Sequence, residues 1–251
     1  MNLIILDPKQ SLGEGVYTLT DRQQLHISNV IKASSGDVLR VGLLNGKMGD
    51  GVYQAPDNEP KGDRVNGTGT GTIHSLSLTL EPPVPLPIVV VMALPRPNML
   101  KRTLQNMSAM GVKEIYLIHS AKVEKSYWQS PVVQLDVIEP VLLEGLEQAK
   151  DTMMPKCQLV PRFRPFVEDQ LPEILEGKRG LLAHPYQAQA CPVNLHEPSV
   201  LALGPEGGWN EFEVAKWLAA GMESVHIGER ILRVETVVPV LLSRLYPVGL
   251  S

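Results

Sequence analysis

The sequence has few cysteines and no long apolar run, and each absence removes a class of protein. Cys157 and Cys191 are the only cysteines in 251 residues, and their spacing matches no metal or redox motif. We therefore expect neither a metal site nor a disulfide. No apolar stretch approaches the roughly 20 residues needed to cross a bilayer, and residues 1–7 lack the charged-then-apolar pattern of a signal peptide. We expect a cytoplasmic protein without membrane contact.

Two common nucleotide-binding motifs are also missing. The chain contains no G-x-x-x-x-G-K-[ST] loop and no G-x-G-x-x-G turn that enters a helix. The alternating run of glycine and threonine over residues 67–72 is followed by no helical pattern, and we interpret it as a glycine-rich strand or turn. A nucleotide- or phosphate-binding enzyme is therefore the least favoured of our hypotheses.

The charge is acidic overall but basic in one segment. A net charge of −4 and a pI near 5.9 argue against non-specific coating of nucleic acid. Between residues 92 and 125, however, six basic residues face only two acids. The basic residues are Arg96, Lys101, Arg102, Lys113, Lys122 and Lys125. A local basic surface on an acidic protein is typical of specific recognition of a negatively charged partner, rather than of attraction by charge alone. An ordinary solvated surface explains the segment equally well.

Residues 1–80 and 88–251 have different patterns. In the first part, short apolar runs are broken by Gly, Asn and Asp, which predicts a small β-barrel domain with one short helix over residues 21–32. Residues 81–87 are rich in proline and predict a stiff linker at the domain boundary.

Residues 88–251 alternate between strand-like and helical patterns, which predicts an α/β domain with a mostly parallel sheet and helices on both faces. Strands are expected over residues 88–94, 114–119, 158–161, 180–183, 200–203 and 224–227, and helices over residues 98–110, 132–150, 167–175, 211–220 and 236–245. Gly111 and Gly221 occupy positions typical of helix C-termini, and Pro239 falls in the first turn of the last expected helix.

Two glycine-bearing loops carry the strongest functional signal. They are Leu-Gly-Pro-Glu-Gly-Gly-Trp-Asn over residues 203–210 and Ile-Gly-Glu-Arg-Ile-Leu-Arg-Val-Glu-Thr over residues 227–236. Gly207 and Gly208 leave backbone N–H groups accessible to a ligand, and Asn210 suits a helix N-cap with a glutamate three positions later. Loops of this kind after neighbouring strands form a ligand crevice in an open α/β sheet. The sequence predicts a small-molecule site there.

Together these loops resemble the RsmE family of ribosomal RNA small-subunit methyltransferases, which belongs to the SPOUT superclass. The supporting matches are Lys101, Gln105, Gly111-Val112 and Ala183-His184-Pro185. The resemblance covers the whole chain, because the family also begins with a PUA-like β-barrel. It implies a SPOUT-type fold with a trefoil knot over residues 88–251, S-adenosylmethionine as methyl donor, and N3 of a uridine in 16S ribosomal RNA as acceptor. It also implies a homodimer that acts on ribosomal RNA or the small ribosomal subunit.

The sequence departs from the family at positions outside the two loops. Asn29 and Lys32 stand where the barrel helix of the family carries arginines, Lys150-Asp151 replaces a Gly-Arg pair, and Val237 replaces an alanine. These changes leave two further hypotheses open. One is an RNA methyltransferase with a different target nucleotide, and the other is a non-catalytic S-adenosylmethionine-binding factor in ribosome assembly.

Methylation of uridine N3 requires loss of the imide proton, which leaves negative charge on O2 and O4. A guanidinium suits that charge because it stays protonated and offers several donors in one plane. We expect Arg233 to fill this role, with Arg230 second and Glu235 in the same catalytic group. A salt bridge from Arg233 to Glu235 or Glu206 is the structural alternative.

The remaining expected site residues fall into two groups. The cofactor group is Ala183, His184, Leu203, Gly204, Pro205, Glu206, Gly207, Gly208, Ile227, Gly228, Ile231, Leu232, Arg233 and Thr236, which hold S-adenosylmethionine mainly through backbone amides. The RNA group is Arg96, Lys101, Arg102, Lys122, Lys125 and His26. Two roles stay open: Glu206 binds the cofactor or only closes its loop, and His184 moves a proton or is structural.

Overall fold

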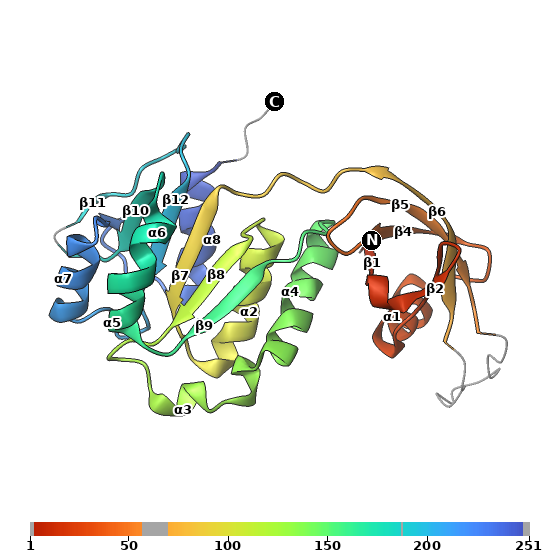
Figure 1. Ribbon diagram of the computed structural model, residues 1–251, viewed down its shortest axis with the longest axis horizontal. Coiled ribbons are helices and arrows are strands. Elements are labelled where there is room, and N and C mark those ends of the chain that lie inside the picture. The colour runs from red at the N-terminus through yellow and green to blue at the C-terminus, as the bar shows by residue number, and fades with distance from the viewer. Residues whose placement is uncertain (1–2, 57–69, 187, 248–251) are drawn as a thin grey trace. The chain divides into compact units, whose positions relative to one another are not determined.

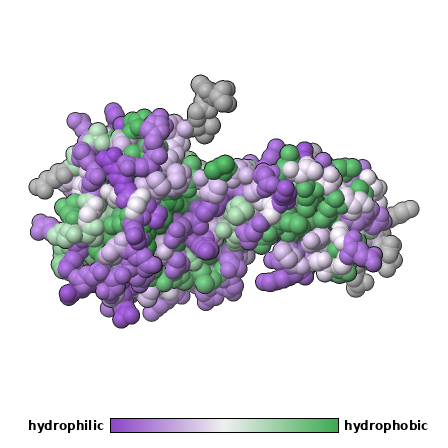
Figure 2. Space-filling view, turned by 45° about the horizontal axis from the view of Figure 1, so that its top comes forward, coloured by the Kyte–Doolittle hydropathy of each residue, from purple (hydrophilic) through white to green (hydrophobic). Residues whose placement is uncertain are grey.

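The computed structural model describes residues 3–56, 70–186 and 188–247, which form two compact units (Figure 1). Unit 1 consists of Met1–Pro83 and Leu146–Met154, and unit 2 consists of Val84–Gly145 and Pro155–Ser251. Residues 67–69 of the glycine-threonine run lie outside the described residues. No helix in the described part of the chain is long and apolar enough to cross a membrane. On the visible face, hydrophilic side chains are interspersed with smaller apolar patches (Figure 2).

Unit 1 is built on one curled six-stranded sheet. Its strands are β1 (Ile4–Leu6), β2 (Ser11–Gly13), β3 (Val16–Thr18), β4 (Val38–Leu43), β5 (Met48–Gln54) and β6 (Thr72–Leu80), in the order β1-β4-β5-β6-β3-β2. Only the β1–β4 pair is parallel. Among the described residues the first and last strands of this order are not paired, so the sheet forms a half-barrel where the sequence predicted a barrel.

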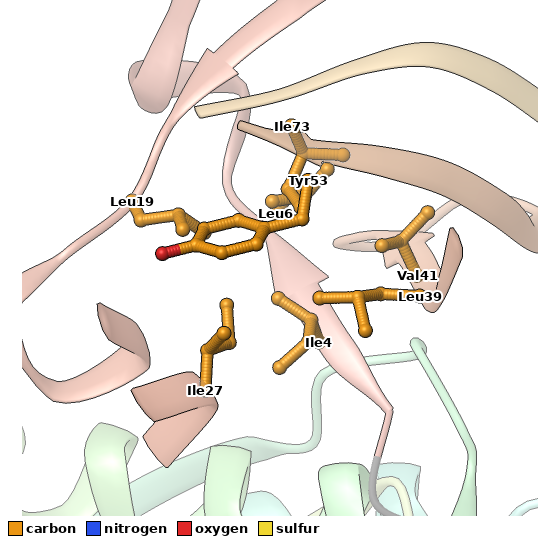
Figure 3. Packing of buried hydrophobic residues seen from close by; sticks show 8 residues of the cluster. All are labelled: Ile4, Leu6, Leu19, Ile27, Leu39, Val41, Tyr53 and Ile73. Carbon is orange, nitrogen blue, oxygen red and sulfur yellow. The ribbon is translucent and has the colours of Figure 1, made fainter. Parts of the chain in front are cut away.

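The core of unit 1 packs one helix against this sheet. Helix α1 (Asp21–His26) begins at a capping box between Thr20 and Gln23 and continues as a π-helix over Ile27–Ile31, which agrees with the predicted helix over residues 21–32. Aliphatic side chains from β1, β4, β6 and the helix surround the Tyr53 ring (Figure 3). Burial of these apolar side chains supplies most of the unit's stabilisation.

The segment Leu146–Met154 belongs to unit 1, although the sequence pattern places it in the second domain. The Leu3 N–H donates to the Glu147 carbonyl at 3.0 Å, and the Asn45 N–H donates to the Thr152 carbonyl at 2.8 Å. The Arg22 guanidinium donates to both carboxylate oxygens of Glu147, at 2.6 and 2.7 Å. Such non-local bonds produce no periodic pattern in the sequence, so they could not be predicted from it. The boundary of unit 1 is therefore not set by the linker at residues 81–87 alone.

Unit 2 contains a seven-stranded parallel sheet. Its strands are β7 (Ile88–Ala93), β8 (Glu114–Ile118), β9 (Lys156–Val160), β10 (Arg179–Ala183), β11 (Gln189–Ala190), β12 (Ser199–Leu203) and β13 (Glu223–His226). The order is β11-β13-β10-β12-β7-β8-β9, and Figure 1 shows helices on both faces. Central strands such as β7 and β12 are buried throughout, as expected for a covered parallel sheet. All six predicted strands form; β11 has too few residues to give a pattern.

Seven α-helices complete the described part of unit 2. They are α2 (Pro97–Ala109), α3 (Lys125–Trp128), α4 (Leu135–Ala149, whose last turn belongs to unit 1), α5 (Phe163–Pro165), α6 (Leu171–Leu175), α7 (Glu211–Ala219) and α8 (Val234–Leu245). A short 3-10 helix (Pro131–Val133) and a π-helix (Phe166–Gln170) also occur in unit 2, and unit 1 has a 3-10 helix at Pro8–Gln10.

Helix ends agree with the sequence in two places and differ in a third. Gly111 and Gly221 follow α2 and α7 with φ of +87° and +93°, the left-handed conformation that glycine adopts without strain. The prediction that Pro239 lies in the first turn of the last helix is wrong. Helix α8 begins at Val234, two residues earlier than expected, so Pro239 lies inside it and cannot donate to the Glu235 carbonyl.

Candidate functional site

The candidate site lies at the carboxyl edge of the parallel sheet. Ala183 pairs with Leu203 on one side and with Val225 on the other, which places β10 between β12 and β13. The expectation that the two glycine loops follow neighbouring strands is therefore wrong, because chain order does not fix lateral strand order. The segment Ala183-His184-Pro185 lies between the two loops, so three expected parts of the cofactor site meet at this edge.

The first loop, residues 203–210, is anchored at its end by a buried glutamate. Asn210 Oδ1 accepts from the Glu213 N–H at 2.7 Å, and Glu213 Oε2 accepts from the Asn210 N–H at 3.0 Å, which confirms the predicted N-cap. The other carboxylate oxygen of Glu213 accepts from the Ala121 N–H at 2.7 Å. Because Glu213 is only 2% exposed, these bonds offset the cost of burying its carboxylate.

The glycines of the first loop are held from two neighbouring segments. The Lys122 ammonium donates to the Gly207 carbonyl at 2.8 Å, and Glu206 Oε1 accepts from the Arg96 N–H at 3.1 Å. The second contact supports a loop-closing role for Glu206. Gly208 has φ of +67°, a conformation that favours glycine. These contacts support the conformation of the loop.

Aromatic packing around Trp209 supports the same loop. Trp209 is buried, and its ring lies 5.4 Å from Trp217 and 6.1 Å from Phe163, measured between ring centroids. Pairs at such separations contribute beyond their buried area. The residue that ends the glycine run is thus fixed in the core of unit 2.

The second loop, residues 227–233, has far fewer contacts. The Gly228 N–H donates to His226 Nδ1 at 3.1 Å, and Gly228 has φ of +122°. Ile231 is 82% exposed. Within residues 3–56, 70–186 and 188–247, no hydrogen bond or salt bridge involves the side chains of Arg230, Arg233 or Glu235. The salt-bridge alternative for Arg233 is therefore not seen, and its guanidinium is available for a ligand.

His184 lies between the two loops. Its N–H donates to the Val225 carbonyl at 3.1 Å, and its ring meets Tyr186 edge-on with centroids 5.7 Å apart. Burial lowers the pKa of His184, and the positive charge of Lys122 lowers it further. A neutral imidazole carries one donor and one acceptor nitrogen, so it can accept a proton at this edge.

The expected RNA group divides between the units. Arg96 precedes α2, Lys101 and Arg102 are exposed on its first turns, and Lys122 and Lys125 are exposed after β8. These five lie in unit 2, whereas His26 lies at the end of α1 in unit 1. The contact of Lys122 with the first loop could not be predicted from a local pattern, since the hydrogen bond joins residues 85 positions apart.

A hollow elsewhere in unit 2 is not the predicted cofactor site. It has a volume of about 200 Å³ and is lined by Gln158, Leu159, Val160, Pro161, Arg162, Pro165 and Gln170. Ligand pockets usually measure roughly 300–1,000 Å³. None of the expected cofactor residues lines this hollow.

The architecture and the loops define an RNA methyltransferase. Residues 82–246 match the family model described as an RNA methyltransferase domain, and the chain belongs to that family. The match includes both glycine loops and the intervening segment Ala183–Pro185.

Two similar sequences are named ribosomal RNA small subunit methyltransferase E. The protein from Treponema pallidum is 25% identical over 243 residues, covering 94% of this chain and 87% of the relative. The protein from Synechocystis is 27% identical over 248 residues, covering 96% of this chain and 76% of the relative. The similarity therefore extends through both units.

Solved structures share the fold over nearly the whole chain. Ribosomal RNA small subunit methyltransferase E from Neisseria gonorrhoeae, bound to S-adenosyl methionine, gives a TM-score of 0.72 at 20% identity and covers 97% of this chain and 95% of its own. A Legionella pneumophila protein solved with S-adenosylmethionine gives a TM-score of 0.72 at 20% identity, with coverage of 96% and 95%.

Proposed function

We propose that this protein is an S-adenosylmethionine-dependent methyltransferase that modifies N3 of a uridine in 16S ribosomal RNA. The observation that carries the proposal is the meeting of both glycine loops with Ala183-His184 at one sheet edge. Membership of the RNA methyltransferase family supports the reaction class. The names of the two relatives support the substrate, and the two cofactor-bound structures support the methyl donor.

The loops have room for the cofactor next to their backbones. A Cβ atom placed on Gly208 or Gly228 would meet no other atom within 4 Å, so both glycines face open space. We assign the adenine, ribose and methionine groups to the backbone amides of residues 203–208 and 227–232. When bound, S-adenosylmethionine supplies a methyl group on a positively charged sulfur.

Two side chains have roles in the transfer. The C–S bond breaks as the N3–C bond forms, the bonding electron pair stays on sulfur, and the N3 proton must leave. The neutral His184 imidazole accepts that proton, and the Arg233 guanidinium stabilises the negative charge on the uracil oxygens. Alignment of N3 with the methyl group provides much of the remaining acceleration.

Three further features follow from the family resemblance. We infer a homodimer, in which the partner subunit covers the exposed Ile231 side chain. We also infer a trefoil knot in unit 2, and action in the cytoplasm where small ribosomal subunits are assembled. The RNA-facing roles of Arg96, Lys101 and Arg102 belong to the same inference.

A second candidate is an S-adenosylmethionine-binding assembly factor without turnover. The observation that favours it is the replacement of Gly-Arg by Lys150-Asp151. Lys150 has φ of +56°, where glycine is favoured, and Asp151 is buried with its carboxylate accepting from the Met153 N–H. The segment therefore serves the packing of unit 1, and it lacks the arginine that the family carries there.

Methyl transfer to ribosomal RNA separates these functions. Small subunits and deproteinised 16S RNA from a strain lacking the protein are incubated with isotope-labelled S-adenosylmethionine, and nuclease digests are analysed by mass spectrometry. We expect labelled 3-methyluridine. Label on another nucleotide indicates a different target, and cofactor binding without label on either substrate indicates the assembly factor. Tight binding of ATP or NAD with no binding of S-adenosylmethionine would restore the nucleotide-binding hypothesis.

A further inference from the structure

An aromatic segment lies beside the first glycine loop. It comprises residues 119–128, which run from the end of β8 through α3. Its start is bonded to α7 by the Ala121 N–H, which donates to Glu213, and to the loop by Lys122 Nζ, which donates to the Gly207 carbonyl. Val123 in the same turn is buried. The segment is therefore a fixed neighbour of the proposed methyl-donor site.

Trp128 is the accessible tryptophan of the described residues. Trp209 and Trp217 are buried, whereas Trp128 is partly exposed. Its indole N–H donates to His119 Nδ1 at 2.9 Å, and the two rings are tilted by 59° with centroids 6.2 Å apart. The bond fixes the orientation of the indole and requires a lone pair on His119 Nδ1. His119 therefore positions Trp128.

Tyr127 adds a second partly exposed ring. Its hydroxyl donates to Glu124 Oε1 at 3.2 Å. Loss of solvent and the contact with Glu124 raise the pKa of Tyr127, while the Arg96 guanidinium acts in the opposite sense and so lies close to the phenol. The Arg96 N–H in turn donates to Glu206 in the first loop. Tyr127 thus interacts with the side chain of Arg96, a residue whose backbone N–H bonds the first loop.

The surroundings favour a nucleic acid base over an apolar peptide. Lys122 and Lys125 are exposed in the same segment, and Glu124 is the acid among them, engaged with Tyr127 and Ser126. Exposed aromatic rings flanked by cations stack with unpaired bases and attract phosphates. An apolar peptide would leave these charges without partners.

We propose that Tyr127 and Trp128 form a stacking surface for an unpaired base of the RNA substrate, and that His119 holds the indole in place. The proposal rests on the proposed function for the identity of the RNA. Uridine N3 lies on the Watson–Crick edge, so the target must leave its base pair and its stack before the methyl group can reach it. A stacking surface next to the donor site offsets the cost of that exposure.

Steady-state methylation of small subunits tests this surface. Replacing Trp128→Ala should raise KM for subunits about tenfold, the loss expected for one base stack, with kcat and cofactor affinity nearly unchanged. Trp128→Phe keeps an aromatic ring and should stay close to wild type. Phe212→Ala removes an exposed ring on α7 (53% exposed) and is the matched control without effect. Tyr127→Ala is the second variant if Trp128→Ala does not fold.

Tryptophan fluorescence provides a second test, which measures RNA binding and does not depend on catalytic turnover. A short single-stranded oligouridylate should quench the emission of the wild type, and the quenching should disappear in Trp128→Phe because the other two tryptophans are buried. Quenching that persists in Trp128→Phe, or a wild-type KM in Trp128→Ala, overturns the proposal. Quenching by whole subunits but not by deproteinised RNA also overturns it, since the partner would then be a protein.

The two tests separate this proposal from the proposed function. Quenching through Trp128 without methylation of any ribosomal RNA contradicts the proposed function and leaves the stacking surface standing. Normal methylation by both Trp128→Ala and Tyr127→Ala supports the function and removes the surface.

Discussion

The two glycine loops of unit 2 are similar in sequence pattern but differ in how they are held. The loop at residues 204–210 receives hydrogen bonds from Arg96 and Lys122, ends in a capping box, and has Trp209 in the core. In the loop at residues 227–233, the Gly228 N–H donates to the His226 side chain, the Arg233 carbonyl accepts from the first turn of α8, and Ile231 is exposed. The first loop is held by hydrogen bonds and packing within the protein. The second loop has fewer contacts of this kind.

This difference indicates a division of roles. A preformed loop pays little ordering entropy when a ligand binds, whereas a loosely held loop is ordered by its ligand or partner. We therefore expect residues 204–208 to supply most of the cofactor affinity. Residues 227–233 should order on binding and bring Arg233 to the reacting uracil.

The largest expected effect is the loss of cofactor binding in Gly207→Val. A Cβ at Gly207 would lie 3.1 Å from Lys122 Cδ, which is flexible enough to move, so the fold should survive. The branched side chain would nevertheless fill the space next to the loop backbone. Calorimetry should show a loss of at least about 100-fold in S-adenosylmethionine affinity. Thermal unfolding is the control, and wild-type affinity would remove the loop from the site.

Replacing Arg233→Ala tests the second loop. The rate of methyl transfer should fall by about 10²–10³-fold, the range for removing one donor to a developing oxyanion, while cofactor affinity changes little. Arg230→Ala, three residues earlier in the same exposed loop, is the matched comparison and should lose less. Equal losses in rate and cofactor affinity would make Arg233 a cofactor ligand or a structural residue.

A smaller effect is expected from the contact that closes the first loop. Glu206→Ala removes the acceptor for the Arg96 N–H, which costs ~1 kcal/mol for an exposed bond of this kind. Cofactor affinity should fall about fivefold. Glu206→Gln keeps a carbonyl acceptor and should bind nearly as well as wild type. If both variants lose affinity equally, the carboxylate charge itself contacts the cofactor.

The smallest change is a shift in the titration of His184. Lys122→Met removes the positive charge that lowers the pKa of His184, while burial remains. The pKa should therefore rise toward its ordinary value without reaching it, as measured by NMR. If His184 accepts the N3 proton, the acidic limb of the pH–rate profile moves to higher pH in this variant. An unchanged limb with a shifted pKa would exclude His184 as the proton acceptor.

Local features of unit 2 could be predicted from the sequence, because their causes are local. Continuous apolar runs predicted the buried strands, and Gly111 and Gly221 predicted two helix ends. Asn210 predicted the N-cap of α7. The position of β10 between β12 and β13 could not be predicted, because it depends on tertiary contacts between distant strands. The same holds for the pairing of Arg96 with Glu206, 110 residues apart.

The extent of unit 1 shows the same limit. A cut at the proline-rich linker would leave Glu147 and Thr152 without their partners from residues 1–83, and Glu147 is only 8% exposed in the intact chain. Removal of residues 1–84 would therefore expose a buried ion-pair partner as well as delete the half-barrel. Point variants in the full chain test RNA recognition more cleanly than this truncation.

Hydrogen exchange with and without S-adenosylmethionine tests the account most directly. Amides of both loops should gain protection when the cofactor binds, because they hold it. The gain should be larger over residues 228–232, which have less support in the free protein than residues 204 and 206–208. Saturating cofactor that leaves both loops unchanged, or that protects the hollow beside β9 instead, would contradict the assignment of these loops as the methyl-donor site.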